Sequence, residues 1–342
     1  MDVTRHRAGT GRPLAVVGVL GVAATAVVRR HRTISAVASD LRTLSLWLPL
    51  FVDNPLVLAA GRRLFDRTSE PVAGTAVSQH EVPGGQDVFV YEPAGRQRPT
   101  GALLWIHGGG TILGRPEADH ELCSRFARDL GVAVVSARYR LAPEHPFPAG
   151  LDDCYAALRW LHHEADALGV DRARIAVGGA SAGGGLAAVV VQRAHDHGLP
   201  VTLQLLLYPM LDDRTALRRD HGGRGRIAWT PRSNRYAWTS YLGHEPRADE
   251  PRRYAAAARR GDLTGLPPAW IGVGDLDLFY EEDLDYARRL RDAGVPVTLR
   301  VEPGMYHAAE LELQAKVPSM RDFQQAMFDA LARGLAGTNA DP

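Results

Sequence analysis

Short apolar runs and longer amphipathic stretches alternate along most of the chain from residue 77 onward. The short runs are rich in β-branched residues and are bounded by glycine or proline, which is typical of buried strands. This pattern predicts strands at 87–91, 102–107, 132–137, 174–178, 201–208, 269–274 and 297–302. It predicts helices between them, at about 117–130, 149–168, 182–195, 282–293 and 320–335. Such alternation indicates an α/β fold, with a mostly parallel central sheet and helices on both faces.

Two stretches depart from the alternation. Residues 41–65 have the pattern of short apolar helices broken at Pro49 and Pro55, because proline lacks the amide donor that a helix interior needs. Residues 211–265 are rich in arginine, glycine and polar residues, and they separate two predicted strands. We therefore predict that helices within residues 41–75 and an insertion at about 211–265 form a small helical cap on the main domain.

Residues 1–40 form an apolar and basic segment. The apolar run from Leu14 to Val28 has 15 residues and is followed by arginines at 29, 30 and 32. A helix that spans a bilayer needs roughly 18 to 20 residues, so we expect this helix to pack on the protein or to rest on a membrane. The alternatives are an uncleaved anchor, ranked second, and a signal peptide, ranked third. A misassigned start codon is a further alternative. The predicted location is the cytoplasm, and peripheral membrane association through this segment stays open.

The composition is that of a globular protein. Apolar residues make up 45% of the chain and charged residues 23%, and the formal net charge of +1 provides no basic excess for nucleic acid. Cys123 and Cys154 fall in predicted amphipathic helices and match no metal-binding or Cys-x-x-Cys spacing, so we interpret them as buried, reduced thiols. No metal, cofactor or nucleic-acid partner is expected, and a homodimer stays open beside a monomer.

A Gly-x-Ser-x-Gly motif at 179–183 follows one predicted strand and begins an apolar helix. This context is typical of a nucleophile elbow, a sharp turn that exposes the serine hydroxyl. The flanking glycines have no Cβ atoms and so allow the crowded turn. The free amides at the start of the helix would lie beside developing negative charge. Ser181 is therefore the predicted nucleophile.

A second glycine-rich motif, His107 to Gly110, ends another predicted strand 74 positions before Ser181. In acyl transfer, negative charge develops on the former carbonyl oxygen, and a glycine-rich loop lets backbone N–H groups approach that oxygen closely. A phosphate-binding loop fits less well, because no lysine followed by serine or threonine comes after the glycines. The two motifs together indicate acyl transfer, with the amide of Ala182 as a further donor.

A general base and an acid should follow the nucleophile along the chain. His307 follows the strand predicted at 297–302 and lies on a loop at the carboxyl edge of the sheet, where ligands bind in open α/β sheets. Asp275 and Asp277 both follow the strand at 269–274, and only one of them should orient the imidazole. Four other histidines lie on or at the ends of predicted helices and are interpreted as solvated, without a third ligand for a metal: His162, His163, His195 and His197.

These motifs resemble those of the hormone-sensitive-lipase-like α/β-hydrolases, the bacterial family IV esterases, over about residues 75–335. Besides 107–110 and 179–184, the stretch 139–149 resembles a loop that is characteristic of the family and supports its site. The resemblance implies the α/β-hydrolase fold. It places the oxyanion-hole amides on Gly109, Gly110 and Ala182.

The resemblance also selects one of the two aspartates. The family's acid usually stands nine residues before a Tyr-Ala pair, here at 286–287, which indicates Asp277. The family's histidine follows about 30 positions later, as His307 does. Three positions depart from the family pattern and leave the fit of the substrate open: Ala180 for Asp, Thr111 for a frequent aromatic residue and Leu278 for Pro.

The sequence therefore predicts a carboxylic ester hydrolase with Ser181, Asp277 and His307 as its catalytic triad, acting through an acyl-enzyme without a metal or cofactor. The resemblance implies small-molecule esters of short to medium acyl chains. An amide or carbamate hydrolase, an acyltransferase and a non-catalytic ligand receptor are the alternatives, and the receptor is disfavoured because all three triad positions are filled. The catalytic domain is predicted to span residues 76–342, with the cap insertion at about 211–265.

Overall fold

The computed structural model describes residues 25, 27–48, 51–64, 68–313 and 316–336. Its centre is an eight-stranded sheet with the order β1-β2-β4-β3-β5-β6-β7-β8. β2 pairs antiparallel with both β1 and β4, and the remaining neighbours pair in parallel. The strands are β1 (Thr75–His80), β2 (Val88–Pro93), β3 (Thr100–Ile106), β4 (Ala133–Ala137), β5 (Val170–Ala180), β6 (Leu203–Leu207), β7 (Ala269–Gly274) and β8 (Val297–Glu302). The predicted fold class, α/β with a mostly parallel sheet, is confirmed.

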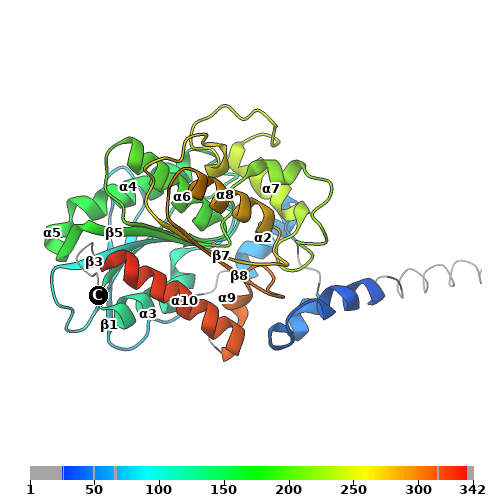
Figure 1. The fold of residues 1–342 in the computed structure, drawn as a ribbon, viewed down its shortest axis with the longest axis horizontal. Helices are drawn as coiled ribbons and strands as arrows, with labels where there is room; N and C mark the ends of the chain where they lie inside the picture. The colour runs from blue at the N-terminus through cyan, green and yellow to red at the C-terminus, as the bar shows by residue number, and fades with distance from the viewer. Residues whose placement is uncertain (1–24, 26, 49–50, 65–67, 314–315, 337–342) are drawn as a thin grey trace, which may run out of the picture.

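Helices cover both faces of this sheet (Figure 1). On one face lie α4 (Ala149–His163), α6 (Ala182–Asp196) and α8 (Tyr280–Asp292), and on the other lie α3 (His120–Leu130) and α10 (Pro318–Leu335). The remaining helices are α2 (Pro55–Leu64), α5 (Ala165–Leu168), α7 (Pro231–Leu242) and α9 (Ala309–Leu313), with 3-10 turns η1 (Ser39–Leu41), η2 (Leu44–Trp47), η3 (Pro116–Asp119), η4 (Asp213–Leu217) and η5 (Ala257–Arg259).

The central strands are mostly apolar because both of their faces are buried. In β3, Leu104 and Ile106 belong to the core beneath α4 and α6, whereas Leu103 and Trp105 belong to the core beneath α3 and α10. Successive side chains of a strand point to opposite faces, so one continuous apolar run supplies both cores. This explains why strand signals in the sequence are runs rather than alternating patterns.

Every predicted strand is present, with ends shifted by up to four residues, and three elements differ from the prediction. β1 was not predicted, because it is an edge strand of polar composition with exposed side chains. The helix predicted at 149–168 is two helices: α4 ends at His163 with Glu164 as its C-cap, and α5 ends at Leu168 before Gly169, whose φ of 61° is left-handed. The helix predicted at 117–130 begins as the 3-10 turn η3 before α3.

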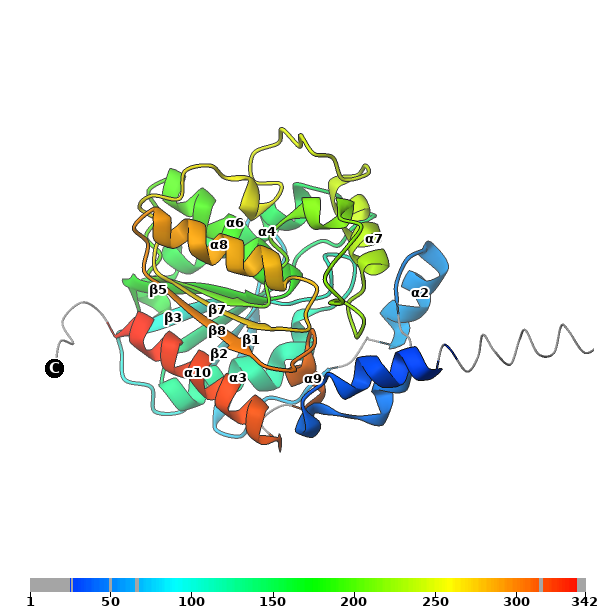
Figure 2. The ribbon, with the colours of Figure 1, turned by 45° about the vertical axis from the view of Figure 1, so that its right-hand side comes forward.

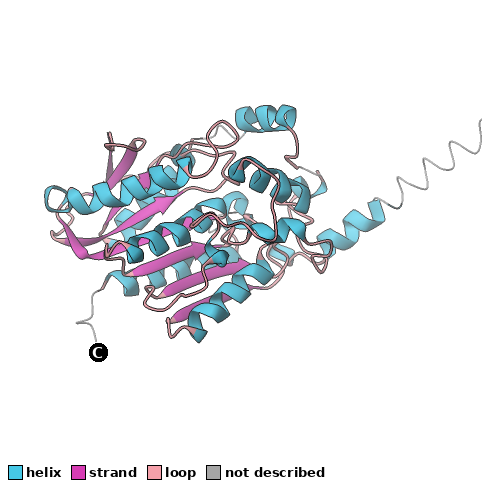
Figure 3. Ribbon diagram, turned by 90° about the horizontal axis from the view of Figure 1, so that it is seen from above, coloured by secondary structure: helices cyan, strands magenta, loops and turns pink. Residues whose placement is uncertain are grey.

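The N-terminal helix of the described chain extends from one side of the main body (Figures 1, 2 and 3), whereas Val37, Leu41 and Leu46, which follow it, are buried in the core beneath α10. Residues 27–35 are helical, and α2 lies on the same side of the molecule (Figure 2). The prediction that Pro55 breaks a helix is wrong. Pro55 begins α2, at a position where its missing N–H needs no partner. Most of the apolar run at 14–28 lies outside the described residues, as does Pro49. In the described part of the chain, no helix is long and apolar enough to cross a membrane.

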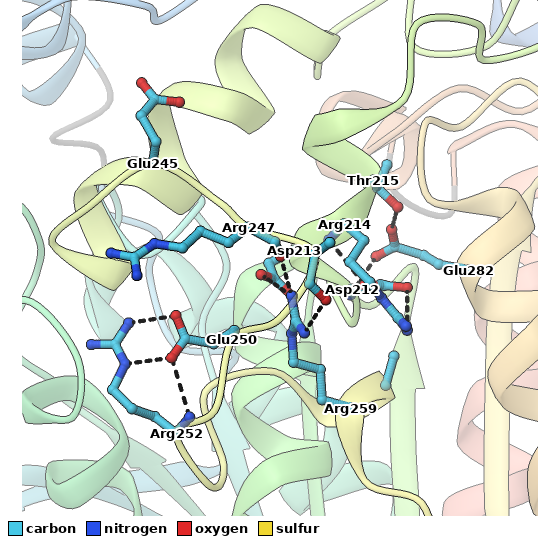
Figure 4. A network of polar contacts seen from close by, with 12 residues as sticks. Asp212, Asp213, Arg214, Thr215, Glu245, Arg247, Glu250, Arg252, Arg259 and Glu282 are labelled. Carbon is cyan, nitrogen blue, oxygen red and sulfur yellow. Dashed lines mark hydrogen bonds and ion pairs between the residues drawn. The ribbon is translucent and has the colours of Figure 1, made fainter.

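The stretch at 211–265 connects β6 to β7 and contains η4, α7 and η5. A polar network holds it together and ties it to α8 (Figure 4). The Arg259 guanidinium donates two hydrogen bonds, of 2.6 and 2.7 Å, to the buried carboxylate of Asp213. Glu282 of α8 accepts a hydrogen bond of 2.7 Å from the amide of Leu211 and another from the Thr215 hydroxyl. The assignment of this stretch and of residues 41–75 to a cap stays a prediction.

Candidate active site

Ser181 lies at the junction of β5 and α6. Its φ of 56° and ψ of −120° are unusual for a residue with a side chain. A Cβ atom at Gly179 would lie 2.5 Å from the backbone of Gly183, and one at Gly183 would lie 2.1 Å from the Ile106 carbonyl oxygen. Only glycine fits at these two positions, so the motif permits the close packing that holds Ser181 in its strained conformation.

His307 lies next to Ser181 and Asp277, on the loop between β8 and α9. Its Nε2 is 2.9 Å from Ser181 Oγ, and its Nδ1 is 2.7 Å from Asp277 Oδ2. Asp277 Oδ1 accepts a hydrogen bond of 2.9 Å from the amide of Phe279, so both carboxylate oxygens are occupied. All three side chains are buried, and Asp277 is 0% exposed. The geometry allows a proton to pass from the serine to the imidazole while the carboxylate fixes the ring.

Asp275 has a different contact. Its Oδ1 accepts a hydrogen bond of 2.7 Å from the amide of Gly304, in the turn that precedes His307. The structure therefore brings Asp277 to the imidazole and leaves Asp275 as a brace for the loop.

The loop after β3 passes directly beside Ser181. Gly109 and Gly110 have φ values of 117° and 63°. Among the described residues, no carbonyl accepts a hydrogen bond from the amides of Gly109, Gly110 or Ala182. The loop is supported by His107, whose Nδ1 donates to the Gly108 carbonyl at 2.8 Å and whose ring stacks on Tyr139 at 4.3 Å. Burial lowers the pKa of His107 to about 4, so this ring is neutral at pH 7.

The stretch 139–149 supports the same loop. The Tyr139 hydroxyl donates to the His107 carbonyl at 3.0 Å, and the amide of Ala142 donates to the Thr111 carbonyl at 2.9 Å. Arg140 holds the buried carboxylate of Asp153 with two hydrogen bonds of 2.9 Å, one from Nε and one from a terminal nitrogen. None of the hydrogen bonds of Tyr139 and Arg140 goes to Ser181, which agrees with a supporting role.

Ser181 and His307 open into a pocket of about 260 Å³ with mostly apolar walls. Its walls include Phe51, Val52, Leu113, Trp229 and Leu311. Two separate parts of the chain therefore border the pocket, the region before β1 and the stretch between β6 and β7. They also contact each other, since the amide of Val52 donates to Ser233 Oγ at 3.0 Å.

Two residues near His307 were missed by the sequence reasoning. The ring of Tyr208 contacts the imidazole edge-on, with centroids 4.6 Å apart, and its hydroxyl donates to the buried carboxylate of Glu310. Burial is the main cause that raises the pKa of Glu310 to about 7. Tyr208 directly follows β6, a strand-end signal like those that selected Asp277 and His307, whereas no pattern in the sequence singles out Glu310.

Replacing Glu310 should change the pH dependence of stability. The folded-state pKa of about 7 is above the unfolded value near 4.5, so the protonated carboxyl favours folding, and this stability is lost as pH rises through 7. The variant Glu310→Gln has no such loss. The difference in free energy of unfolding between the variant and wild type, measured with urea, should shift in favour of the variant by roughly 3 kcal/mol from pH 5 to pH 8. An equal difference at both pH values would contradict this assignment.

The other predicted positions are mostly as expected. Cys123 in α3 and Cys154 in α4 are buried free thiols, and His163, His195 and His197 are exposed. His162 was wrongly interpreted as solvated: it is buried between α4 and the segment before β6, and its Nε2 bonds to the Pro200 carbonyl at 3.0 Å. Within the described residues, no group of three or more His, Cys, Asp or Glu side chains could hold a metal ion.

Comparison with known proteins places the chain in a family. Residues 103–311 match the family described as alpha/beta hydrolase fold. The chain belongs to the hormone-sensitive-lipase-like, or family IV, α/β-hydrolases. It is 38% identical to the carboxylic ester hydrolase LipN of Mycobacterium tuberculosis, over 75% of this chain and 71% of LipN. It is 37% identical to the carboxylesterase NlhH of the same organism, over 73% of this chain and 76% of NlhH.

Solved esterase structures agree with this assignment. A bacterial heroin esterase superposes with a TM-score of 0.81 and 36% identity, covering 89% of this chain and all of that chain. The esterase LipW from Mycobacterium marinum superposes with a TM-score of 0.77 and 31% identity, covering 88% and 96%. This family member is therefore an enzyme, a serine hydrolase of the carboxylesterase and lipase-like type.

Proposed function

We propose that the enzyme hydrolyses carboxylic esters through a triad of Ser181, His307 and Asp277. The observation that carries the proposal is the continuous line of contacts from Ser181 Oγ to His307 Nε2, at 2.9 Å, and from His307 Nδ1 to Asp277 Oδ2, at 2.7 Å. Ser181 attacks the ester carbonyl while His307 takes its proton and then returns it to the leaving alcohol. Water, activated by the same imidazole, releases the acid from the acyl-enzyme.

The oxyanion of the tetrahedral intermediate is bound by the amides of Gly109, Gly110 and Ala182. Their N–H groups have no partner among the described residues and lie on the two backbone segments that meet at Ser181. Donors that are fixed before the reaction stabilise the developing charge without reorganising.

The variant Gly110→Ala should disturb this oxyanion hole. A Cβ atom there would lie 2.3 Å from the Trp229 ring, and the φ of 63° is strained for alanine, so the loop must shift. Loss of one well-placed donor lowers kcat by about 10² to 10³. The matched control is Gly131→Ala, at a helix end with a φ of 66° and open space around its Cβ, which should keep wild-type kcat. Equal kcat in both variants would exclude Gly110 from the oxyanion hole.

The preferred substrates are proposed to be esters of short acyl chains. The pocket volume of about 260 Å³ is below the range of about 300 to 1,000 Å³ that is typical of sites for drug-sized ligands. With p-nitrophenyl esters of increasing acyl length, kcat/KM for butanoate should exceed that for dodecanoate at least roughly tenfold. The variant Trp229→Ala removes one wall and should reduce this preference. A wild-type preference for dodecanoate would contradict the proposed size limit.

A further inference from the structure

Exposed apolar side chains are concentrated in one part of the molecule. Nine large apolar side chains of the described residues are exposed, and seven of them lie in 27–48 and 51–56, here called the projecting segment: Val27, Val28, Leu44, Trp47, Leu48, Phe51 and Leu56. Leu44 is 88% exposed and Leu56 is 84% exposed. Such gatherings of exposed apolar residues mark interaction surfaces.

The same segment is basic. A hollow of about 500 Å³ is lined by Arg29, Arg30, Arg32 and Thr33 of the projecting segment and by Arg226. The Arg30 guanidinium donates to the carbonyls of Arg226, at 2.9 Å, and Leu48, at 3.4 Å. Within the described residues, none of these four arginines forms an ion pair with a carboxylate. No carboxylate in the part of the chain that the structure describes therefore compensates their charges.

The charge of the chain is distributed unevenly. Residues 27–56 contain four arginines and two aspartates, a net charge of +2, whereas the whole chain has a net charge of +1. The rest of the molecule therefore has a net charge of −1 by subtraction. A projecting basic surface on a protein without other excess positive charge favours an anionic partner.

This surface borders the Ser181 pocket. Phe51, at 38% exposure, belongs to the projecting segment and also lines the pocket. Leu311, an exposed residue of α9, lines the same pocket at 60% exposure. The N-terminal helix and α2 stand on one side of the main body (Figure 2). A partner that binds the projecting segment would therefore lie beside the entrance to the Ser181 pocket.

We propose that the projecting segment docks the enzyme on an anionic membrane surface, with its arginines at the lipid headgroups and its apolar side chains at the acyl boundary. Amphipathic elements that combine arginine with Leu and Trp bind membranes in this way. A second copy of the chain fits less well, because it would bring two sets of four uncompensated arginines together. The docking concerns binding alone and does not depend on the reaction at Ser181.

The test is cosedimentation of the full-length protein with phosphatidylcholine vesicles, with and without phosphatidylglycerol. Wild type should bind only the anionic vesicles, and high salt should release it. The variant Arg29→Gln/Arg32→Gln should lower the partition coefficient roughly 30-fold. The variant Leu44→Asp/Leu48→Asp should lower it at least roughly tenfold.

Two matched controls keep the result specific. The first, Arg159→Gln/Arg288→Gln, removes two exposed arginines from α4 and α8. The second, Leu217→Asp, changes an exposed leucine of η4. Both control variants should bind anionic vesicles as wild type does. Every variant should retain its wild-type melting temperature and its rate on a water-soluble ester. The proposal is wrong if wild type ignores anionic vesicles, or if the Arg29 and Leu44 double variants bind unchanged. It is also wrong if the protein is a dimer that Leu44→Asp/Leu48→Asp dissociates, with no binding to vesicles.

Discussion

Ser181→Ala should lower kcat for a p-nitrophenyl ester by about 10⁶. Without the hydroxyl no acyl-enzyme forms, and the imidazole, 2.9 Å away in the wild type, has no proton to take. The pocket and the oxyanion amides would remain, so slow hydrolysis above the rate in water should persist. Steady-state kinetics at saturating substrate measure the loss.

A buried serine outside the pocket provides the matched control. Ser124 in α3 is 0% exposed and donates to the His120 carbonyl at 2.6 Å. Ser124→Ala should therefore cost stability and leave kcat near wild type. Circular dichroism should first show that Ser181→Ala is folded. If this variant then kept more than about a hundredth of the wild-type kcat, another nucleophile would carry the reaction.

Asp277→Asn should lower kcat by about 10⁴, the loss that follows when the acid of a serine-protease triad becomes its amide. The carboxylate accepts the Nδ1–H of His307 at 2.7 Å, and an amide there can donate to Nδ1 instead, which favours the wrong tautomer. The amide of Phe279 would keep the side chain in place, because it donates to the other oxygen at 2.9 Å. The loss should therefore appear in kcat with little change in fold.

Asp275→Asn is the paired variant for this prediction. Asp275 accepts from the Gly304 amide at 2.7 Å and has no contact with the imidazole, so an amide oxygen can replace the lost acceptor. Its kcat should stay within about tenfold of wild type, and its melting temperature should fall slightly. A crippled Asp275→Asn beside an active Asp277→Asn would reverse the assignment of the acid.

Much of the site could be predicted from the sequence because its residues stand at strand ends. Ser181 follows the buried end of β5 and His307 follows the edge strand β8, and the carboxyl ends of parallel strands meet at one edge of the sheet. The role of the glycines around Ser181 could also be predicted, because the sharp turn leaves no room for side chains. A Cβ atom at Gly183 would lie 2.1 Å from the Ile106 carbonyl oxygen. Local spacing and steric limits sufficed for these residues.

Residues that act through tertiary contacts could not be predicted. Trp229 comes from an irregular stretch, and its place against Gly110 depends on how that stretch folds back over the sheet. His162 has the sequence context of an exposed helical residue, yet the segment before β6 covers it and supplies the Pro200 carbonyl. Glu310 follows His307 by three positions, and its hydrogen-bond partner Tyr208 is distant in sequence. Burial of such single polar residues has no periodic signal.

The central claim, that Ser181 is the nucleophile of an esterase, is tested most directly by covalent labelling. Wild-type enzyme treated with a fluorophosphonate should lose its activity with p-nitrophenyl butanoate as one adduct forms per chain. Mass spectrometry of the digest should place that adduct on Ser181, and Ser181→Ala should take up none. Complete inactivation with the adduct on a different residue, or full activity after stoichiometric labelling of Ser181, would contradict the account.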